Sequence, residues 1–467
     1  MLLARHGRPL RRRVVAVAVA ALMATAASPG ARQTAVADHG KPRGTVLAWG
    51  DNGGGELGDG TTMNRDTPVR VCAPGQTAPC TRFLSHVAIA AGTDHSLGLL
   101  RDGSVLAWGN NAFGQLGDGT TMNRDTPVPV CAPGQTAPCT RSLTDVAAVD
   151  AGTDHSLALR RDGTVLAWGD NAGGQLGDGT TMNRDTPVPV CAPGQTAPCT
   201  RFLAGVVAIS AHGGHSMALL RDGSVVAWGN NGSGQLGDGT TTNRDTPVPV
   251  CAPGQAAPCA RFLTHVAAID AGRTHALALG EDGSVLAWGD NAFGELGDGT
   301  TINRNTPVRV CASGQTAPCS RFLTHVRTIT AGRNHSLALR RDSTVLAWGN
   351  NAFGELGDGT TTNRNTPVRV CAPGQTAPCS RFLTHVRTIT AGGRDSLALG
   401  EDDTALTWGD NAFGQLGDGT TTNRNTPVRV CASGQTAPCS RFLTHVRTIT
   451  AGGQHSLALV DDQRARH

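Results

Sequence analysis

Short runs of β-forming residues alternate with turn residues along most of the chain. One representative stretch contains four such runs, at 206–209, 215–220, 224–228 and 246–250. Each run is too short for a stable helix, and the valine, leucine, threonine and tryptophan in these runs are typical of strands and their packed faces. Every such stretch therefore predicts four β-strands.

The second and third runs predict an antiparallel hairpin. In one copy, His155–Arg160 and Thr164–Trp168 are joined through Asp162-Gly163, a pair suited to the positive φ angles of a tight turn. Apolar side chains fall on both faces of the third run, as expected when neighbouring sheets cover both. In the fourth run, Pro247 and Pro249 remove alternate ladder donors, which places that strand at an outer edge. The four runs are therefore expected in order from the centre to the rim.

This unit recurs seven times. The chain has one tryptophan per copy, with spacings of 59 and then 60 residues, at positions 49, 108, 168, 228, 288, 348 and 408. The copies fill the chain from Thr45 to Val460, so one repeat domain is expected at 45–461. A short segment, 38–44, precedes it, and a tail, 462–467, follows it.

Seven four-stranded units favour a β-propeller, in which ring closure leaves only short strand edges exposed. An open solenoid is the alternative, but solenoids have atypical end repeats, and the last copy here resembles the internal ones. The chain begins with only the Trp49 and Pro68 strands and ends with only the Val446 and His455 strands. The sequence therefore predicts an all-β, seven-bladed propeller of four-stranded antiparallel blades, closed by N- and C-terminal strands that share one blade.

The composition supports this fold and limits the classes of partner that the protein can bind. The 61 glycines and 39% apolar residues suit a core of thin sheets. Six arginines and no acid lie in the first 37 residues, which leaves 34 basic and 36 acidic residues in the remainder. Binding to phosphates needs a basic surface, and base stacking needs aromatic residues, which make up only 4% of the chain. Generic nucleic-acid binding is therefore disfavoured.

The N-terminus has the layout of a secretory signal peptide, expected at 1–37. Arg11, Arg12 and Arg13 precede an apolar stretch at 14–27, and small-residue sites follow at 24–26 and 35–37. Export by a twin-arginine route and an uncleaved anchor are alternatives. No later stretch approaches 18 consecutive apolar residues, so no membrane span is expected after signal removal. The protein is predicted to be secreted or at the cell surface.

The cysteines predict local disulfides. All fourteen occur at one spacing, once per copy, as 72/80, 131/139, 191/199, 251/259, 311/319, 371/379 and 431/439. Zinc sites need four ligands within reach, usually two to four residues apart within a pair, whereas here seven residues intervene and each pair sits on its own copy. In an exported chain, seven disulfides that stabilise the crossover between blades are the better interpretation.

No catalytic or metal-binding machinery is expected. The histidines of the Ala-Gly-x-x-His motif (95, 155, 215, 275, 335 and 455) lie on different blades, and Asp395 replaces one, so a structural role is favoured over a metal or proton-relay ring. Asp154, His155 and Ser156 cannot form a triad because adjacent strand residues point to opposite faces. The Asp-Gly-Thr-Thr runs indicate turns rather than calcium loops. No cofactor is implied, and the protein is predicted not to be an enzyme.

Differences between the copies point to a partner site. The loop after the tryptophan strand carries phenylalanine at 293, 353 and 413, and the inner strand of the same sector carries arginine at 327, 387 and 447. The same copies have asparagine in place of aspartate at 305, 365 and 425. Arginine with aromatic residues is the composition of binding hot spots. Duplication of one copy, with each phenylalanine packed between blades, is the alternative.

The repeats also resemble a known family. Trp168–Gly177 carries the pattern Trp-Gly-x-Asn-x-x-Gly-Gln-Leu-Gly, and Ala151–Leu159 carries Ala-Gly-x-x-His-Ser-x-x-Leu. Both resemble repeats of the regulator of chromosome condensation family, here as a secreted bacterial member. The resemblance implies a seven-bladed propeller used as a binding platform. The eukaryotic namesake acts on chromatin and a small GTPase, and secreted bacterial members inhibit β-lactamases.

We therefore expect an exported, monomeric, non-enzymatic propeller that captures an extracellular macromolecule, namely a protein, through loops on one face. One alternative is a guanine-nucleotide-exchange or chromatin-associated regulator like the namesake, but the export signal, the cysteines and the lack of a basic tail depart from it. Another is an extracellular polysaccharide-active propeller enzyme, which needs acidic or histidine groups that converge at the channel mouth.

Overall fold

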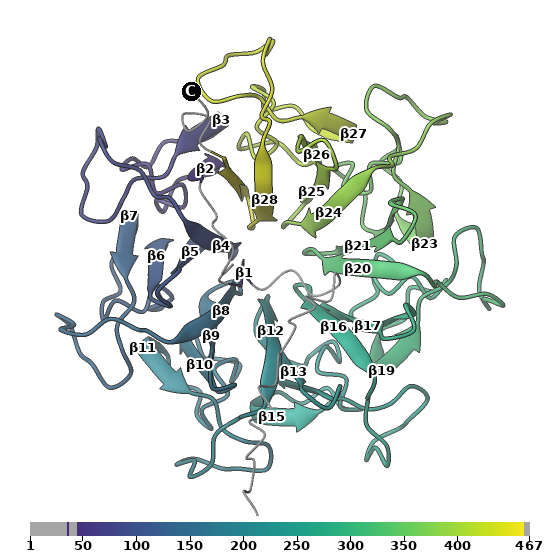
Figure 1. The fold of residues 1–467 in the computed structure, drawn as a ribbon. Coiled ribbons are helices and arrows are strands. Elements are labelled where there is room, and N and C mark those ends of the chain that lie inside the picture. Colours follow the sequence, from purple (N-terminus) through teal and green to yellow (C-terminus); the bar gives the residue numbers. More distant parts are fainter. Residues whose placement is uncertain (1–34, 37–43, 462–467) are drawn as a thin grey trace, which may run out of the picture.

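Each repeat forms a four-stranded antiparallel sheet in the computed structural model, which describes residues 35–36 and 44–461. The seven sheets stand around a central opening, with the inner strand of each nearest to it (Figure 1). The described residues contain no helix. The predicted all-β, seven-bladed propeller is confirmed. Of the predicted signal peptide, only residues 35–36 are described. Residues 37–43 and the tail 462–467 also lie outside the described residues.

The strands follow the same order from the centre to the rim in every blade. The inner strands are β4 (Val87–Ala91), β8 (Val146–Ala151), β12 (Val206–His212), β16 (Val266–Ala271), β20 (Val326–Ala331), β24 (Val386–Ala391) and β28 (Val446–Ala451). The second strands are β5 (His95–Leu100), β9 (His155–Arg160), β13 (His215–Leu220), β17 (His275–Gly280), β21 (His335–Arg340), β25 (Asp395–Gly400) and β29 (His455–Val460). The third strands are β2 (Thr45–Gly50), β6 (Val105–Gly109), β10 (Val165–Gly169), β14 (Val225–Gly229), β18 (Val285–Gly289), β22 (Val345–Gly349) and β26 (Ala405–Gly409). The outer strands are β3 (Arg65–Arg70), β7 (Arg124–Pro129), β11 (Arg184–Pro189), β15 (Arg244–Pro249), β19 (Arg304–Arg309), β23 (Arg364–Arg369) and β27 (Arg424–Arg429).

One blade joins the two ends of the chain. Its inner half is β28 and β29, and its outer half is β2 and β3. β2 pairs with β29 along its whole length, from Thr45 opposite Val460 to Gly50 opposite His455. The ring is therefore closed by a shared blade, as the sequence predicts, and every blade has a neighbour on both sides.

The edges of the sheets lie at the rim and at the central opening. The proline-containing fourth strands are outermost, where β11 pairs only with β10, so Pro187 and Pro189 cost no ladder bonds. At the inner edge, the two-residue strand β1 (Ala35–Val36) pairs antiparallel with β8. These two residues belong to the predicted signal peptide.

The hydrophobic core lies between blades. Trp348 is fully buried in a cluster that includes Leu277 and Leu296 of the preceding blade. Its indole N–H donates to the backbone carbonyl of Glu295, 2.7 Å away in that blade. Trp49, in the shared blade, makes the equivalent bond to the carbonyl of Gln415 in the blade before it. Each tryptophan therefore fastens one blade to the next, which confirms its predicted core role.

Buried histidines add a polar link between blades. His275 Nε2 lies 2.9 Å from the Ser336 hydroxyl, which itself donates to the carbonyl of Glu295. Because the hydroxyl proton is already engaged, the imidazole donates its Nε2–H. Burial lowers the pKa of His275 to about 3, so the ring is neutral. The structure has five such pairs: His95–Ser156, His155–Ser216, His275–Ser336, His335–Ser396 and His455–Ser96.

Two junctions lack this link. At one, Ala276 stands at the serine position and His215 Nε2 has no hydrogen-bond partner. At the other, Asp395 replaces histidine, and both of its carboxyl oxygens are fully buried without a partner. Burial, followed by the nearby charge of Asp410, raises the pKa of Asp395 well above its usual value. A buried polar group without partners destabilises a fold. The junction at Asp395 is therefore less stable than the junctions that have a histidine–serine pair.

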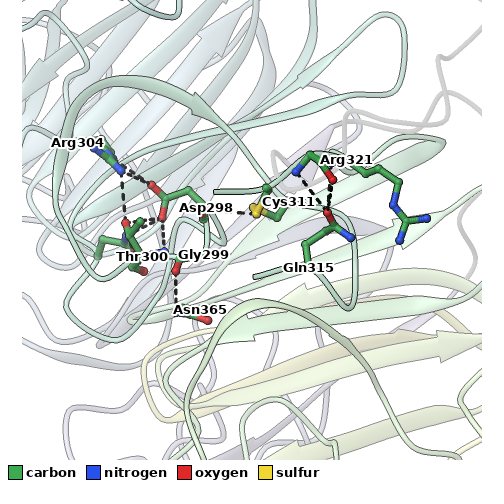
Figure 2. Close-up of a disulfide and its surroundings, with 11 residues drawn as sticks. Asp298, Gly299, Thr300, Arg304, Cys311, Gln315, Arg321 and Asn365 are labelled. Atoms are coloured by element: carbon green, nitrogen blue, oxygen red, sulfur yellow. Dashed lines mark hydrogen bonds and ion pairs between the residues drawn. A yellow bond between two sulfur atoms is a disulfide. The ribbon is translucent and has the colours of Figure 1, made fainter. Parts of the chain in front are cut away.

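All fourteen cysteines form disulfides with the predicted local pairing: Cys72–Cys80, Cys131–Cys139, Cys191–Cys199, Cys251–Cys259, Cys311–Cys319, Cys371–Cys379 and Cys431–Cys439. Each bond lies in the crossover from an outer strand to the next inner strand. Figure 2 shows one crossover, in which the Gln315 side chain accepts the backbone N–H of Arg321 at 3.3 Å. The Arg321 side chain itself extends away from these contacts (Figure 2).

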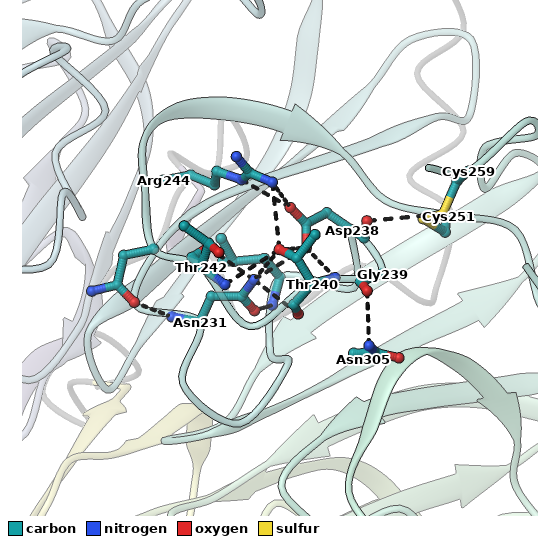
Figure 3. Close-up of polar contacts among 11 residues, drawn as sticks. Asn231, Asp238, Gly239, Thr240, Thr242, Arg244, Cys251, Cys259 and Asn305 are labelled. Atoms are coloured by element: carbon teal, nitrogen blue, oxygen red, sulfur yellow. Dashed lines mark hydrogen bonds and ion pairs between the residues drawn. A yellow bond between two sulfur atoms is a disulfide. The ribbon is translucent and has the colours of Figure 1, made fainter. Parts of the chain in front are cut away.

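The Asp-Gly-Thr-Thr runs form hydrogen-bonded turns. Figure 3 shows Asp238, which accepts bonds from the backbone N–H and the hydroxyl of Thr240, at 2.9 and 2.7 Å. Its second oxygen pairs with Arg244 at 2.7 Å, and the amide of Asn231 donates to the first at 3.1 Å. The carboxylate therefore orders the loop and the start of the outer strand.

Candidate functional site

The loops of the ring gather on two opposite faces. The loop face contains the short turns after the inner strands, such as 332–334, and the long loops after the third strands, such as 350–363. The hairpin face contains the turns after the second strands, such as 341–344, and the starts of the inner strands. Because successive strands are antiparallel, these two sets lie at opposite ends of the same strands.

The three predicted phenylalanines lie on the loop face. Phe293, Phe353 and Phe413 occupy the long loops after β18, β22 and β26. Phe293 is 39% exposed, and the other two are half-buried. The structure therefore does not enclose these rings between blades, which was the alternative interpretation, and leaves part of each in contact with solvent.

The three predicted arginines lie on the hairpin face instead. Arg327 donates to the backbone carbonyls of Arg340 and Val386, the latter at 2.7 Å. Arg387 pairs with Asp403 at 2.7 Å and donates to the carbonyl of Val446. Arg447 pairs with Asp461 at 2.6 Å. Arg327 and Arg387 connect neighbouring inner strands, and Arg447 binds the end of the second strand in its own blade. The structure does not bring these arginines together with the phenylalanines.

The asparagines of the same copies also have structural partners. Figure 3 shows Asn305, whose amide donates to the carbonyl of Gly239 in the preceding blade at 2.8 Å. Asn365 makes the same bond to Gly299 at 2.9 Å (Figure 2). The change from aspartate to asparagine therefore adds a donor that links two blades.

Three other arginines lie on the same face as the phenylalanines, and sequence reasoning missed them. Arg273, Arg333 and Arg394 lie in the short turns after β16, β20 and β24, on the loop face. The guanidinium of Arg394 stacks over the ring of Phe353, with 4.8 Å between its central carbon and the ring centroid. We call Arg273, Arg333, Arg394, Phe293 and Phe353 the basic cluster. Its signal in the sequence was the variable pair x-x in Ala-Gly-x-x-His, which reads Arg-Thr, Arg-Asn and Gly-Arg in these three copies.

Backbone hydrogen bonds hold the short turns side by side around the central opening. The Arg273 N–H donates to the carbonyl of Gly332, and the Arg333 N–H donates to that of Gly392, both at 3.3 Å. The bond from Gly393 continues the series to the following blade at 2.9 Å. The backbones that carry the three arginines are therefore fixed relative to one another.

Positive charges lie close enough together in the basic cluster to affect one another. Burial lowers the pKa of Arg333, and Arg273 and Arg394 lower it further. Burial, and then the same Arg273 and Arg333, lowers the pKa of the half-buried His212 to about 4. His212 is therefore neutral at physiological pH, and the local charge comes from the arginines.

The opposite side of the opening is acidic. Asp94 and Asp154 occupy the turns after β4 and β8. Burial, then Asp94 and Asp170, raises the pKa of Asp154 to about 6. Burial and Asp51 raise the pKa of Asp94. The short turns of the loop face are thus polarised, with a basic half and an acidic half around one opening, although the long loops beside the arginines also carry Glu295 and Glu355.

The buried histidines and serines have no catalytic arrangement. Ser156 is bonded to His95 of the preceding blade, while His155 is bonded to Ser216 of the following blade. The run Asp154-His155-Ser156 is therefore not a triad, as predicted. Among residues 44–461, no three histidine, cysteine or acidic side chains are grouped to hold a metal ion. No helix in that part of the chain is long and apolar enough to span a membrane.

Comparison with known families decides the classification. A model described as the RCC1-like domain matches residues 192–466, and the regulator of chromosome condensation (RCC1) repeat matches 43–99, 102–159 and 162–219. The chain belongs to the RCC1 repeat family. Together these matches cover every blade, so the family assignment and the observed architecture agree.

Two relatives show how far the sequence similarity extends. The ultraviolet-B receptor UVR8 of Arabidopsis thaliana is 27% identical over 384 residues, 82% of this chain and 76% of that protein. The E3 ubiquitin-protein ligase HERC2 of Homo sapiens is 28% identical over 423 residues, 89% of this chain but 8% of the ligase.

Solved structures show the same fold at low identity. Yeast RCC1 (Prp20), solved bound to Kap60, is 22% identical with a TM-score of 0.67, and the match covers 91% of this chain and 90% of that one. Human WBSCR16 is 22% identical with a TM-score of 0.66, covering 90% and 99%.

Proposed function

We propose that this protein is an exported, non-enzymatic binding propeller that captures an extracellular protein through its loop face. The observation that supports it most is the basic cluster, in which cationic and aromatic side chains gather at one end of the ring. Arginine and aromatic residues are enriched in the energetic centres of protein interfaces. Fixed turns that carry such side chains also lose little conformational entropy on binding.

Export is supported by two independent features. Seven disulfides form readily in an oxidising compartment and are rare in the cytosol. The arginine-led apolar stretch near the N-terminus is typical of a secretory signal. A nucleotide-exchange or chromatin factor works inside the cell, so both features oppose that alternative.

The polysaccharide-active alternative has weaker support. Its carboxylates would have to converge at the channel mouth, and the acidic half does place Asp94 and Asp154 there. However, Asp154 is engaged by the Gln115 amide at 3.2 Å. The hollow found on the rim, about 580 Å³, is lined by Pro253, Val308 and Phe322 and lies away from these acids.

Capture of a secreted protein tests the proposal. The chain 38–467 is immobilised and exposed to proteins from the culture medium of the source cells. We expect one protein to be retained, and we expect the triple change Phe293→Ala, Phe353→Ala and Phe413→Ala to weaken its binding by at least about 10-fold, because these rings supply exposed apolar area on the loop face.

A matched variant provides the control. Phe202, Phe262 and Phe442 are 47%, 48% and 37% exposed, but they lie in the disulfide crossovers. Their replacement by alanine removes the same atoms and should leave capture unchanged. Binding that survives the loop-face change but is lost in this control would place the partner on the other side of the molecule.

A further inference from the structure

Eleven arginines of the described residues pair with an aspartate, and the arginines of the basic cluster are not among them. In each outer strand the first arginine pairs with the aspartate of its Asp-Gly-Thr-Thr turn, as Arg364 does with Asp358 at 2.7 Å. Arg273, Arg333 and Arg394 form no salt bridge within residues 44–461. Three like charges are thus held together without a salt bridge. The charge of Arg394 acts on Glu355, but the two groups form no ion pair among the described residues.

The arrangement of these charges suits a chain-like anion. The three arginines come from three successive blades, and hydrogen bonds fix their backbones around the opening. Phe353 supports the Arg394 guanidinium from one side, which leaves its N–H edges available to a bidentate acceptor. A segment with several carboxylates, laid across the turns, would meet one guanidinium after another.

Exposed apolar surface beside the charges favours a peptide over a purely ionic ligand. Phe293 is 39% exposed on the same face, and the half-buried Phe353 lies against Arg394. Sulfated or phosphorylated polymers offer charge but few apolar groups for these rings.

We propose that the basic cluster binds an acidic segment of the partner protein, with carboxylates on Arg273, Arg333 and Arg394 and an apolar side chain against Phe293 and Phe353. This proposal rests on the proposed function and specifies the chemistry of its partner. The acidic half of the loop face would repel the same segment, which restricts its binding to the basic half.

Two synthetic peptides test this proposal. One has twelve residues, mostly glutamate, with a central phenylalanine, and the other has glutamine at every glutamate position. By fluorescence anisotropy, the chain 38–467 should bind the glutamate peptide at least about 10-fold more tightly than the glutamine peptide. The triple variant Arg273→Gln, Arg333→Gln and Arg394→Gln should lose that preference.

A second triple variant controls for net charge. Arg321, Arg381 and Arg441 are exposed in the disulfide crossovers, and their replacement by glutamine removes the same three charges from elsewhere. It should retain the wild-type preference. Equal binding of both peptides by the wild type, or equal loss in both triple variants, would overturn the proposal.

A sulfated oligosaccharide with the same charge as the glutamate peptide tests whether the cluster binds sulfated polymers instead of an acidic peptide. Tighter binding of the oligosaccharide than of the glutamate peptide would also overturn the proposal, because the cluster would then recognise sulfate groups. If neither probe binds while the captured protein still depends on Phe293, Phe353 and Phe413, only the acidic chemistry is wrong. If capture no longer depends on those residues, the proposed function itself fails.

Discussion

Reduction of the seven disulfides should lower the melting temperature of the propeller by roughly 10–20 °C. Each bond joins cysteines eight positions apart, and closing a loop of that size contributes on the order of 2.6 kcal/mol by restricting the unfolded chain. The bonds lie in the crossovers between blades, so their loss also frees the segments that pass from one blade to the next. Differential scanning calorimetry with and without a phosphine reductant measures the effect.

Removal of a single disulfide should have a proportionally smaller effect on the melting temperature. Cys371→Ser with Cys379→Ser takes away one disulfide and should lower the melting temperature by only about 2–3 °C. If full reduction of all seven disulfides lowers the melting temperature by no more than this single removal, the crossovers are held by their hydrogen bonds and packing alone.

Replacement of Asp395 by histidine should stabilise the protein by about 2 kcal/mol at pH 7. The other six copies carry a buried histidine at this position, so the side chain has a site of matching shape. Ser456, in the next blade, already donates to the carbonyl of Gln415 at 3.2 Å and can accept the new Nε2–H. The change therefore removes two buried oxygens without partners and restores the inter-blade link.

The stabilisation should also grow with pH. The pKa of Asp395 is raised by burial, so the folded protein retains a proton that the unfolded chain releases, and the wild type loses stability as pH rises. Histidine at the equivalent position has its pKa lowered to about 3, so the variant loses stability only as pH falls below about 6.5. Urea unfolding at pH 5 and pH 8 should show the larger difference at pH 8.

A second repair serves as the comparison. Ala276→Ser restores the partner of His215 but introduces no titrating group, so its stabilisation should be the same at both pH values. A difference for Asp395→His that stays constant or shrinks from pH 5 to pH 8 would contradict both titrations on which it rests, a proton retained by buried Asp395 and a neutral histidine in its place.

The architecture follows from the sequence because its signals are local and repeated. One tryptophan per copy, Asp-Gly between the second and third strands and alternating prolines in the fourth strand each constrain one element, and seven copies repeat the constraint. The incomplete first and last copies then require a shared blade. The pairing of Cys72 with Cys80 and its equivalents is also local, so spacing alone predicts it.

The candidate site could be predicted only in part, since it depends on which end of a strand each residue occupies. Phe353 and Arg387 vary in the same copies, but the first follows a third strand and the second begins an inner strand, and antiparallel strands carry them to opposite faces. Arg273, Arg333 and Arg394 come together through ring closure and contacts between turns of different blades. Their positions within the repeat also differ by one residue, which concealed the pattern.

Hydrogen–deuterium exchange of the propeller with and without its captured partner tests the central claim, that binding occurs on the loop face. We expect slower exchange in the turns 272–274, 332–334 and 392–394 and in the loops 290–296 and 350–356. The hairpin turns, such as 341–344, and the disulfide crossovers should exchange at unchanged rates. Protection confined to those hairpin turns and crossovers, with the loop face unaffected, would contradict the account.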